Sequence, residues 1–141
     1  MYTANSTDAQ RIHFSADQAH AAMRELIGRI GYDEQQQRVI ANHLLDAALC
    51  GYEYSGLPKI LELAGTAKAQ LPKVPPRTVY ETPVSALIDG GNTVGMLVVD
   101  DATDQSIGKA REHGFAVVGV FNTWMTGRSA YYVERIANAG L

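Results

Sequence analysis

The most constraining feature of the sequence is the stretch of residues 115–132, FAVVGVFNTWMTGRSAYY. Its apolar run at residues 115–120 predicts a buried β-strand, the polar residues 122–127 predict a turn, and residues 129–132 predict the start of a helix. Ligands in open α/β sheets bind in the crevice beyond the carboxyl ends of the strands. The turn is therefore a candidate ligand site, although an ordinary strand–turn–helix connection would have the same pattern.

A second strand and a second helix are predicted just before this stretch. The strand is expected at residues 84–89, and the helix is expected to be capped by Asn92 or Thr93 and to end at Gly114. A helical crossover between two strands favours parallel pairing with a right-handed connection. Residues 78–81 are a candidate edge strand. So small a sheet leaves apolar surface exposed, and we expect the remainder of a longer chain or a partner subunit to cover it.

The first part of the chain has helical periodicity instead. Ser15 and Asp33 are each followed three residues later by glutamine, which is the spacing of a capping box at the start of a helix. A third helix is expected after Pro58, because proline is well suited to the first turn of a helix. Together these helices make up a predicted helical segment.

A proline-rich connection separates the two parts. Three prolines lie between positions 72 and 76, where they prevent a helix from continuing and favour an extended chain. The sequence thus predicts a helical segment at residues 1–71, a crossover at residues 72–83 and an α/β segment at residues 84–141. The predicted fold class is α/β, with three helices followed by a β-α-β-α unit.

Composition and charge exclude several classes of function. Of the 141 residues, 46% are apolar and 19% are charged, which is typical of a soluble domain. The net charge is −3 and the basic residues are scattered, so no surface for a nucleic-acid backbone is expected. The sequence has neither a signal-peptide pattern nor an apolar run long enough to span a membrane, which predicts a cytoplasmic protein.

Cysteine and histidine give no sign of a metal or redox site. Cys50 is the only cysteine, and its helical context predicts a buried thiol rather than a nucleophile. His43 lies on the apolar stripe of the second helix, which predicts a hydrogen-bonded core histidine rather than a ligand or a base. No two histidines have the i, i+4 spacing of a helical metal site, so we predict no bound metal.

The order of these features resembles a known family. The segment GYEYSGLPKI at residues 51–60, the helix that ends at Gly114 and residues 115–141 are similar to the N-terminal part of the type-2 malate/L-lactate dehydrogenase family. The resemblance covers nearly the whole chain and implies an α/β fold that is distinct from the Rossmann fold. Family proteins are longer, with most of the nicotinamide-binding domain expected after Leu141, so the chain resembles a truncated relative.

The resemblance also implies an activity. Members of the family reduce 2-oxo acids, or cyclic imino acids in one branch, with NADH or NADPH. The resemblance therefore implies an NAD(P)-dependent oxidoreductase with a small-molecule substrate. It further implies a homodimer with its sites near the subunit interface.

The first family motif is Ser-His-Gly, followed shortly by arginine, at the start of the third helix. Tyr54, Ser55 and Gly56 occupy the three motif positions, and Lys59 occupies the position of the arginine. Ser55 thus stands in the place of a histidine. Lys59 can still attract a substrate carboxylate, but as a point charge rather than as a planar fork.

The second family motif is Asn-x-x-His-x-Gly, followed by a pair of tyrosines. Asn122, Gly127 and the tyrosine pair match it, whereas Met125 stands in the position of the histidine. A thioether has no proton to exchange near neutral pH. The candidate catalytic positions are therefore Ser55, Lys59 and Met125, and the candidate substrate- or cofactor-binding positions are Tyr54, Gly56, Asn122, Trp124, Gly127 and Tyr132.

The residue types at these positions fit a reduction in part. Hydride transfer to a carbonyl needs a proton donor within hydrogen-bond distance and a cation for the substrate carboxylate. Tyr54, Tyr131 and Tyr132 are candidate donors, but each can instead be a packing aromatic with its hydroxyl at the surface. Trp124 can form a wall for a flat ring or pack at a subunit interface.

Two functions of different classes remain open. One is an NAD(P)-dependent oxidoreductase that acts on a 2-oxo acid, a cyclic imino acid or a related small molecule. The other is a non-catalytic ligand-binding or interaction module derived from that family. With both histidines replaced, we expect ordinary 2-hydroxy-acid dehydrogenase activity to be weak or absent. A bulkier or already protonated substrate, such as an iminium, is favoured over lactate or malate.

Overall fold

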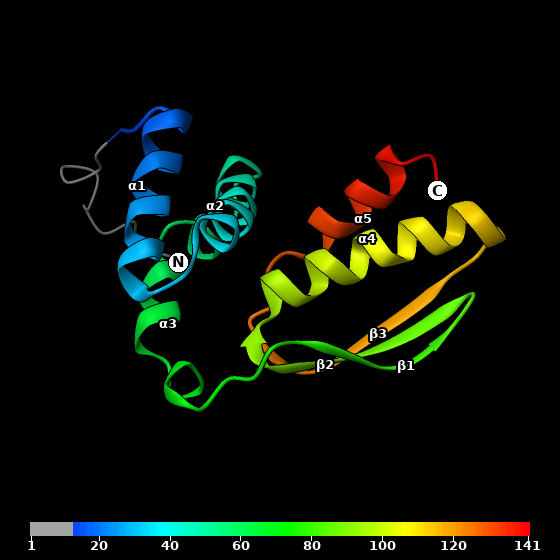
Figure 1. Cartoon of the computed structure of the whole chain (residues 1–141). Helices are drawn as coiled ribbons and strands as arrows, with labels where there is room; N and C mark the ends of the chain where they lie inside the picture. The colour runs from blue at the N-terminus through cyan, green and yellow to red at the C-terminus, as the bar shows by residue number, and fades with distance from the viewer. Residues whose placement is uncertain (1–12) are drawn as a thin grey trace, which may run out of the picture.

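A computed structural model describes residues 13–141, which form a group of helices beside a sheet that is covered by two further helices (Figure 1). We call residues 13–71 the helical half and residues 77–141 the sheet half. The helical half consists of α1 (Ala16–Ile30), α2 (Glu34–Leu49), the 3-10 helix η2 (Glu53–Ser55), α3 (Lys59–Gly65) and the 3-10 helix η3 (Ala67–Gln70).

Both predicted capping boxes are confirmed. Ser15 Oγ accepts the Gln18 N–H at 3.2 Å, and Asp33 Oδ1 accepts the Gln36 N–H at 2.9 Å. The glutamine side chains accept the N–H groups of the two capping residues in return. α1 ends at Gly31, whose φ of 107° gives the left-handed cap that glycine adopts without strain.

The three helices pack around one core, which extends into the sheet half. The fully buried side chains at its centre are Met23, Ile27, Ile40, Leu44 and Leu63. Met96 and Trp124 from the sheet half belong to the same cluster, so the two halves share this core. Leu26 of α1 is apolar but 45% exposed, because the face of α1 that contacts the other helices is narrower than its apolar pattern.

The sheet half has three strands and two helices. They are β1 (Arg77–Thr82), β2 (Ser85–Val94), α4 (Gly95–His113), β3 (Val117–Trp124) and α5 (Ser129–Asn138). The strand order is β1-β2-β3, with β1 antiparallel to β2 and β2 parallel to β3. The parallel crossover through α4 and the candidate edge strand are both confirmed. β1 lies within residues 72–83, the segment that the sequence assigned to the crossover.

The predicted helix cap at Asn92 or Thr93 is wrong. β2 continues to Val94, and α4 begins immediately afterwards without a side-chain cap. The pairing of β2 with β3 is interrupted after Asp89 and resumes at Thr93. Hydrogen bonding to the neighbouring strand therefore overrides the local capping preference of these residues.

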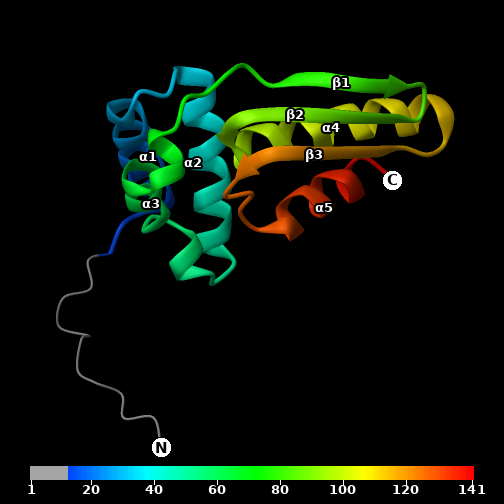
Figure 2. The same ribbon diagram turned by 90° about the horizontal axis from the view of Figure 1, so that it is seen from below.

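The apolar run at residues 115–120 is not a fully buried strand, contrary to the prediction. Phe115 precedes β3 and is 61% exposed, while β3 continues to Trp124 and includes the first part of the predicted turn. α4 and α5 cover one face of the sheet, whereas the opposite face is open in the view from below (Figure 2). Apolar residues occupy both faces of β3, so the alternation that identifies a strand covered on one side is hidden.

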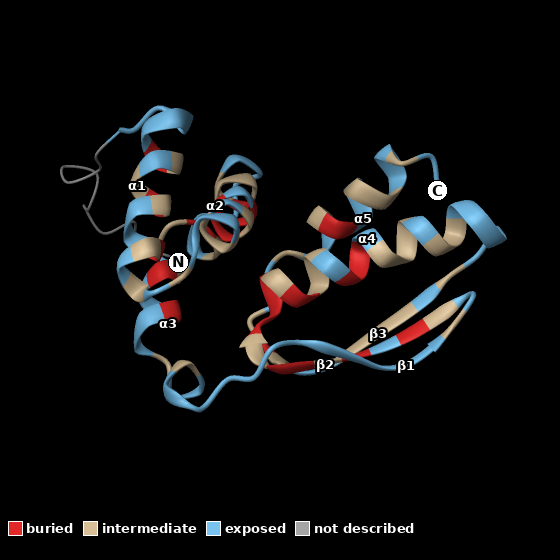
Figure 3. Ribbon diagram, in the orientation of Figure 1, coloured by how far each residue is buried: buried red, intermediate tan, exposed pale blue. Residues whose placement is uncertain are grey.

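Residues of the sheet differ in burial along the strands, as the colours of the ribbon show (Figure 3). Ile88 of β2 packs with Val98 of α4 in the covered core. On the open face, Leu87, Val117 and Phe121 are 39%, 55% and 45% exposed. The expectation that so small a sheet leaves apolar surface exposed is therefore confirmed.

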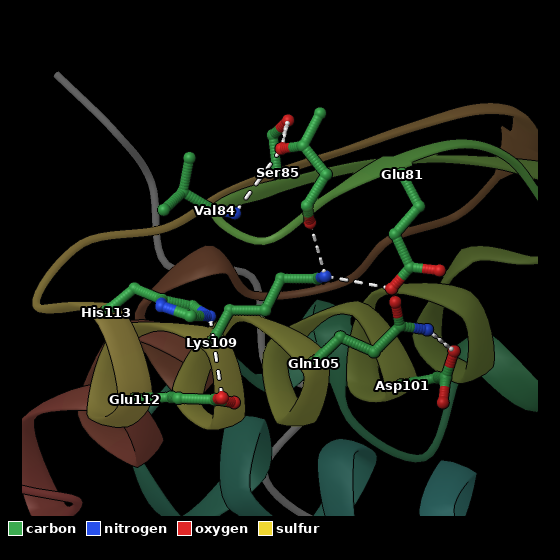
Figure 4. Close-up of polar contacts among 9 residues, drawn as sticks. Glu81, Val84, Ser85, Asp101, Gln105, Lys109, Glu112 and His113 are labelled. Atoms are coloured by element: carbon green, nitrogen blue, oxygen red, sulfur yellow. Dashed lines mark hydrogen bonds and ion pairs between the residues drawn. The ribbon is translucent and has the colours of Figure 1, made fainter.

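Lys109 of α4 holds the turn between β1 and β2 against the helix (Figure 4). Its Nζ donates to Glu81 Oε1 and to the backbone oxygen of Thr82, both at 2.8 Å. Within the turn, the hydroxyls of Thr82 and Ser85 bond at 2.6 Å, and the Val84 N–H donates to Thr82 Oγ1. These bonds fix the start of β2, the strand whose other end leads to the candidate site.

Cys50 is exposed, so the prediction of a buried thiol is wrong. Ala47 is the last buried residue of α2, and the helix ends at Leu49. Cys50 therefore lies in the turn beyond the part of α2 that contacts the core. The local sequence indicates a helix here but does not show where its packing partners end.

The described part of the chain shows neither a metal-binding cluster nor a membrane-spanning helix. In residues 13–141, no group of three or more His, Cys, Asp or Glu side chains is arranged to hold a metal ion. None of the helices in the same residues combines the length and the apolar character that crossing a membrane requires.

Candidate functional site

Two segments that are distant in sequence meet where the helical and sheet halves join. Residues 54–59 come from the helical half, and residues 124–127 come from the end of β3 and the loop after it. Both segments line a cavity of about 480 Å³. Six of the nine predicted site residues line it, namely Tyr54, Ser55, Lys59, Trp124, Met125 and Gly127.

A glycine holds the first segment against α2. Gly56 is buried, and a Cβ atom at this position would lie 2.8 Å from the Cβ atom of Ala48. Any larger residue would push the segment away from α2. Gly56 therefore packs behind the cavity, while Ser55 and Lys59 on either side of it line the cavity.

The second segment is held by bonds to β2 and α4. Trp124 Nε1 donates to the backbone oxygen of Asn92 at 3.0 Å, and the Met96 N–H donates to the backbone oxygen of Met125 at 3.2 Å. Met125 has a φ of 55°, which is uncommon for a residue that carries a side chain. Backbone strain of this kind clusters at ligand sites, where the surroundings hold it in place.

Among the lining residues in the described part of the chain, Lys59 carries the only positive charge. Its Nζ lies 2.7 Å from Glu62 Oε1 and 5.6 Å from the centre of the Tyr54 ring. The carboxylate and the ring face of Tyr54 both attract the ammonium group. The cation is therefore held at the edge of the cavity.

His43 lies directly behind the cavity wall. A Cβ atom on Gly127 would lie 2.0 Å from His43 Nε2, so glycine is needed to leave room for the imidazole. His43 Nε2 accepts the Arg128 N–H at 2.8 Å, and the rings of Tyr131 and Tyr132 lie 4.6 and 5.2 Å away. Burial lowers the pKa of His43 to about 4. The predicted hydrogen-bonded core histidine is confirmed, with a neutral imidazole as the acceptor.

Arg128 connects this wall to α2 and α5. Its Nε donates to Asp46 at 3.0 Å, and its two terminal nitrogens donate to Glu134 at 3.2 and 3.1 Å. Hydrogen bonds to Glu134 and Asp46 raise the pKa of Arg128 above its ordinary range. The loop is thus anchored at both ends, by α4 at Met125 and by α2 and α5 at Arg128.

Besides Gly56, two further predicted binding residues do not line the cavity, namely Asn122 and Tyr132. Asn122 Nδ2 donates to Asp89 Oδ1 at 2.8 Å, and the Gly91 N–H together with this amide lowers the pKa of Asp89. The Tyr132 hydroxyl donates to the backbone oxygen of Thr126 at 2.7 Å, and burial raises the pKa of Tyr132. Asn122 therefore links β3 to β2, whereas Tyr132 supports the loop from behind.

The lining also contains residues that were not predicted as site residues, namely Leu44, Glu62, Thr66, Met96 and Thr126. Leu44 and Met96 are apolar residues of α2 and α4, and only the packing of the helices decides which such positions reach a cavity. Glu62 did have a signal. It follows Lys59 by three residues, so the two side chains share a face of α3.

The lining combines an apolar wall with a polar edge. Met96, Trp124 and Met125 form the wall, and Ser55 and Lys59 lie at the edge. Such a cavity can exclude water from a flat ring while a charge orients a carboxylate. This set of side chains can contact a flat ring and a small carboxylate at the same time.

Comparison with known proteins leads to the family that the motifs indicated. Residues 14–141 match the malate/L-lactate dehydrogenase family. Hydroxycarboxylate dehydrogenase B from Escherichia coli strain K12 is 28% identical over 130 residues, which are 90% of this chain and 36% of that protein. L-sulfolactate dehydrogenase from Methanocaldococcus jannaschii is 28% identical over 116 residues, which are 81% of this chain and 34% of that protein.

Comparison of this structure with solved structures indicates the same family. Malate dehydrogenase from Pyrococcus horikoshii OT3 superposes with a TM-score of 0.84 at 26% identity, over 92% of this chain and 38% of that one. The chain thus spans little more than a third of the length of these relatives. Its mixed α/β fold corresponds to an N-terminal portion of family members, which are dehydrogenases. The chain belongs to the malate/L-lactate dehydrogenase family.

Proposed function

We propose that the intact protein is an NADH- or NADPH-dependent oxidoreductase that reduces a small 2-oxo acid, a cyclic imino acid or a related compound. The observation that carries the proposal is the convergence of the two motif segments. Ser55 and Lys59 of the helical half and Met125 of the sheet half line the same cavity. Side chains from separate elements around one cavity can hold a substrate in a single orientation.

The relatives support a small carboxylate as the substrate. The names of hydroxycarboxylate dehydrogenase B, L-sulfolactate dehydrogenase and malate dehydrogenase all refer to carboxylates. In this chain, Lys59 is the lining residue that can bind such a group. Because an ammonium is a point charge, it orients a carboxylate less strictly than an arginine fork does.

The apolar wall suits the nicotinamide end of the cofactor. When bound, the cofactor supplies a hydride for the carbonyl or iminium carbon of the substrate. Trp124 can contact a flat ring, and its indole is fixed by the bond from Nε1 to the backbone oxygen of Asn92. Met96 and Met125 exclude water from the same region.

The side chains around the cavity favour a substrate that already carries its proton. Reduction of a carbonyl to a hydroxyl consumes a hydride and a proton, whereas reduction of a protonated imine to an amine consumes only the hydride. Ser55 and Met125 stand where the family resemblance implies two histidines, and neither side chain is an effective acid near neutral pH. His43 is no substitute, because its pKa of about 4 keeps the imidazole neutral. The Tyr132 hydroxyl is already bonded to Thr126.

A steady-state assay of the intact protein with lactate, malate and a cyclic imino acid tests the proposal, with each cofactor in the appropriate redox state. We expect turnover of the imino acid, and turnover of the two hydroxy acids that is weaker by on the order of 10²–10⁴-fold. Met125→His and Ser55→His are expected to raise hydroxy-acid turnover. Ser129→His, at an exposed position outside the cavity lining, is the matched control.

Rapid wild-type oxidation of lactate or malate would contradict the expected preference. It would mean that Tyr54, Lys59 or a residue outside this chain donates and accepts the proton. Equal gains in Met125→His and Ser129→His would show that the added histidine does not act from the cavity.

A non-catalytic ligand-binding or interaction module is the second candidate. It is favoured by Ser55 and Met125, which stand where the family resemblance implies two histidines. Fluorescence titration of the intact protein with NADH and NADPH separates the two candidates, because only the oxidoreductase needs to bind a nicotinamide cofactor. The homodimer and the cytoplasmic location stay predictions, and sedimentation of the intact protein tests the first of them.

A further inference from the structure

The charge of Lys59 is balanced within the lining of the cavity. Lys59 Nζ lies 2.7 Å from Glu62 Oε1, and the two side chains are 22% and 55% exposed. Both residues line the cavity. A ligand that enters therefore meets a contact ion pair rather than a free cation.

We propose that Glu62 is a specificity-determining residue, which makes the cavity favour ligands with a cationic nitrogen beside their carboxylate over plain carboxylates. This role rests on the proposal above that the cavity binds the small-molecule ligand of the protein. Neither family motif includes this position, and the role follows from the contact between Glu62 and Lys59.

Repulsion between like charges disfavours a plain carboxylate. Its oxygens must share Lys59 Nζ with the carboxylate of Glu62, and one negative charge then remains without a partner. The apolar wall formed by Met96 and Trp124 lowers the local polarity, which strengthens the repulsion. An existing side chain that competes with the wrong ligand is a common source of selectivity.

A ligand with neighbouring opposite charges avoids this conflict. Its carboxylate can contact Lys59 while its cationic nitrogen contacts Glu62, so that opposite charges alternate around the site. In 2-imino and 2-amino acids, the nitrogen and the carboxyl group are bonded to the same carbon. The two charges are therefore about as close together as those of the Lys59–Glu62 pair, and the carbon skeleton is left to contact Trp124 and Met125.

Two matched ring compounds test this role of Glu62. L-Pipecolate carries a cationic ring nitrogen beside its carboxylate, and cyclohexanecarboxylate has a methylene group in place of that nitrogen. Isothermal titration calorimetry measures the binding of either compound without a label. The dissociation constants are measured for the intact protein as wild type, Glu62→Gln and Glu25→Gln. Glu25 is the matched control, because it forms an intrahelical pair with Arg29 on α1 at 2.5 Å and does not line the cavity.

Wild type is expected to bind L-pipecolate more tightly than cyclohexanecarboxylate. In Glu62→Gln, we expect L-pipecolate to bind more weakly and cyclohexanecarboxylate more tightly, each by about two- to fivefold. Glu25→Gln should change neither constant. An unchanged ratio of the two constants in Glu62→Gln would overturn the role of Glu62, as would a wild type that binds neither compound.

The assay with NADH and NADPH separates this result from the proposed function. Turnover together with an unchanged ratio removes the role of Glu62 and leaves the oxidoreductase. A shifted ratio without any turnover removes the oxidoreductase and leaves Glu62 as the residue that selects the ligand.

Discussion

The helical half and the sheet half bury their apolar residues in different ways. Ile40 and Leu63 at the centre of the helical half are completely buried, because helices contact them from several sides. Val117 and Phe121 on the open face of the sheet are 55% and 45% exposed, although they are as apolar as the residues of a core. The helical half is thus stabilised mainly by contacts within the described chain, whereas the sheet half has contacts on one face only. The candidate site lies between the closed core of the helical half and the sheet, whose other face is open.

The largest expected effect comes from removing core side chains in the two halves. Ile40→Ala is expected to lower the free energy of unfolding by about 2–5 kcal/mol, because it leaves a cavity in a closed core. Phe121→Ala is expected to change it by only about 0.5 kcal/mol, because the side chain is half exposed. Urea unfolding of the 141-residue chain measures both. A similar loss in the two variants would show that the open face is covered in solution, for example by a second copy.

The next effect is a dependence of stability on pH, which tests the contact between His43 of α2 and the loop at Gly127 and Arg128. The pKa of His43 is about 4 in the folded chain, against an ordinary value of 6.5. The unfolded chain therefore binds an extra proton between these values, so the stabilisation is fully present above pH 6.5 and is lost as the pH falls toward 4. The expected loss is about 3 kcal/mol, from a shift of this size.

Urea unfolding measured between pH 7 and pH 4 checks this prediction. His43→Gln should flatten the pH dependence, because the amide oxygen can accept the Arg128 N–H without binding a proton. His13→Gln is the control, because it removes an exposed histidine that lies outside the contact between His43 and the loop. If both variants keep the full wild-type slope, His43 is not its source.

A substitution at Gly127 tests whether the contact between His43 and the loop also depends on the shape of the space between them. Gly127→Ala requires a left-handed alanine at φ 78° and directs its Cβ atom to within 2.0 Å of His43 Nε2. Gly114→Ala requires nearly the same conformation, at φ 82°, but meets nothing within 4 Å. We expect Gly127→Ala to lose about 1–3 kcal/mol more than Gly114→Ala, since it displaces a buried hydrogen-bonded imidazole. Thermal unfolding of the pair measures the difference, and equal losses would mean that the loop moves away at no cost.

The smallest expected effect concerns helix caps. Asp33→Ala removes the side chain that accepts the Gln36 N–H and should cost about 1 kcal/mol of stability. Thr93→Ala changes a residue that was predicted to cap α4 but lies in β2, and should cost no more than about 0.5 kcal/mol. The comparison uses chemical denaturation of both variants. A larger loss for Thr93→Ala would mean that the start of α4 depends on this side chain after all.

Much of the candidate site could be predicted from its motifs, but not the role of each position. Ser55 and Met125 occupy motif positions, and both line the cavity. Gly56 and Tyr132 lie in the same motifs but pack behind it, because one contacts Ala48 and the other bonds to the loop backbone. Spacing in the sequence identifies the segment that reaches a site. The side of that segment that faces the ligand depends on its packing partners, which the sequence does not reveal.

By itself, the sequence determined the first two helices and their capping boxes, and the parallel strand–helix–strand unit. These features depend on contacts between residues three or four apart, or on a connection of suitable length, and such contacts are encoded by spacing. Only the tertiary structure decided that β2 continues through Thr93, that Cys50 is exposed and that His43 fills the space behind Gly127. In each of these cases, groups that are distant in sequence decide the outcome, because they take a backbone bond, fill a volume or, at Cys50, do not reach the residue. The outcome is set by the free energy of the whole packing arrangement rather than by local preference.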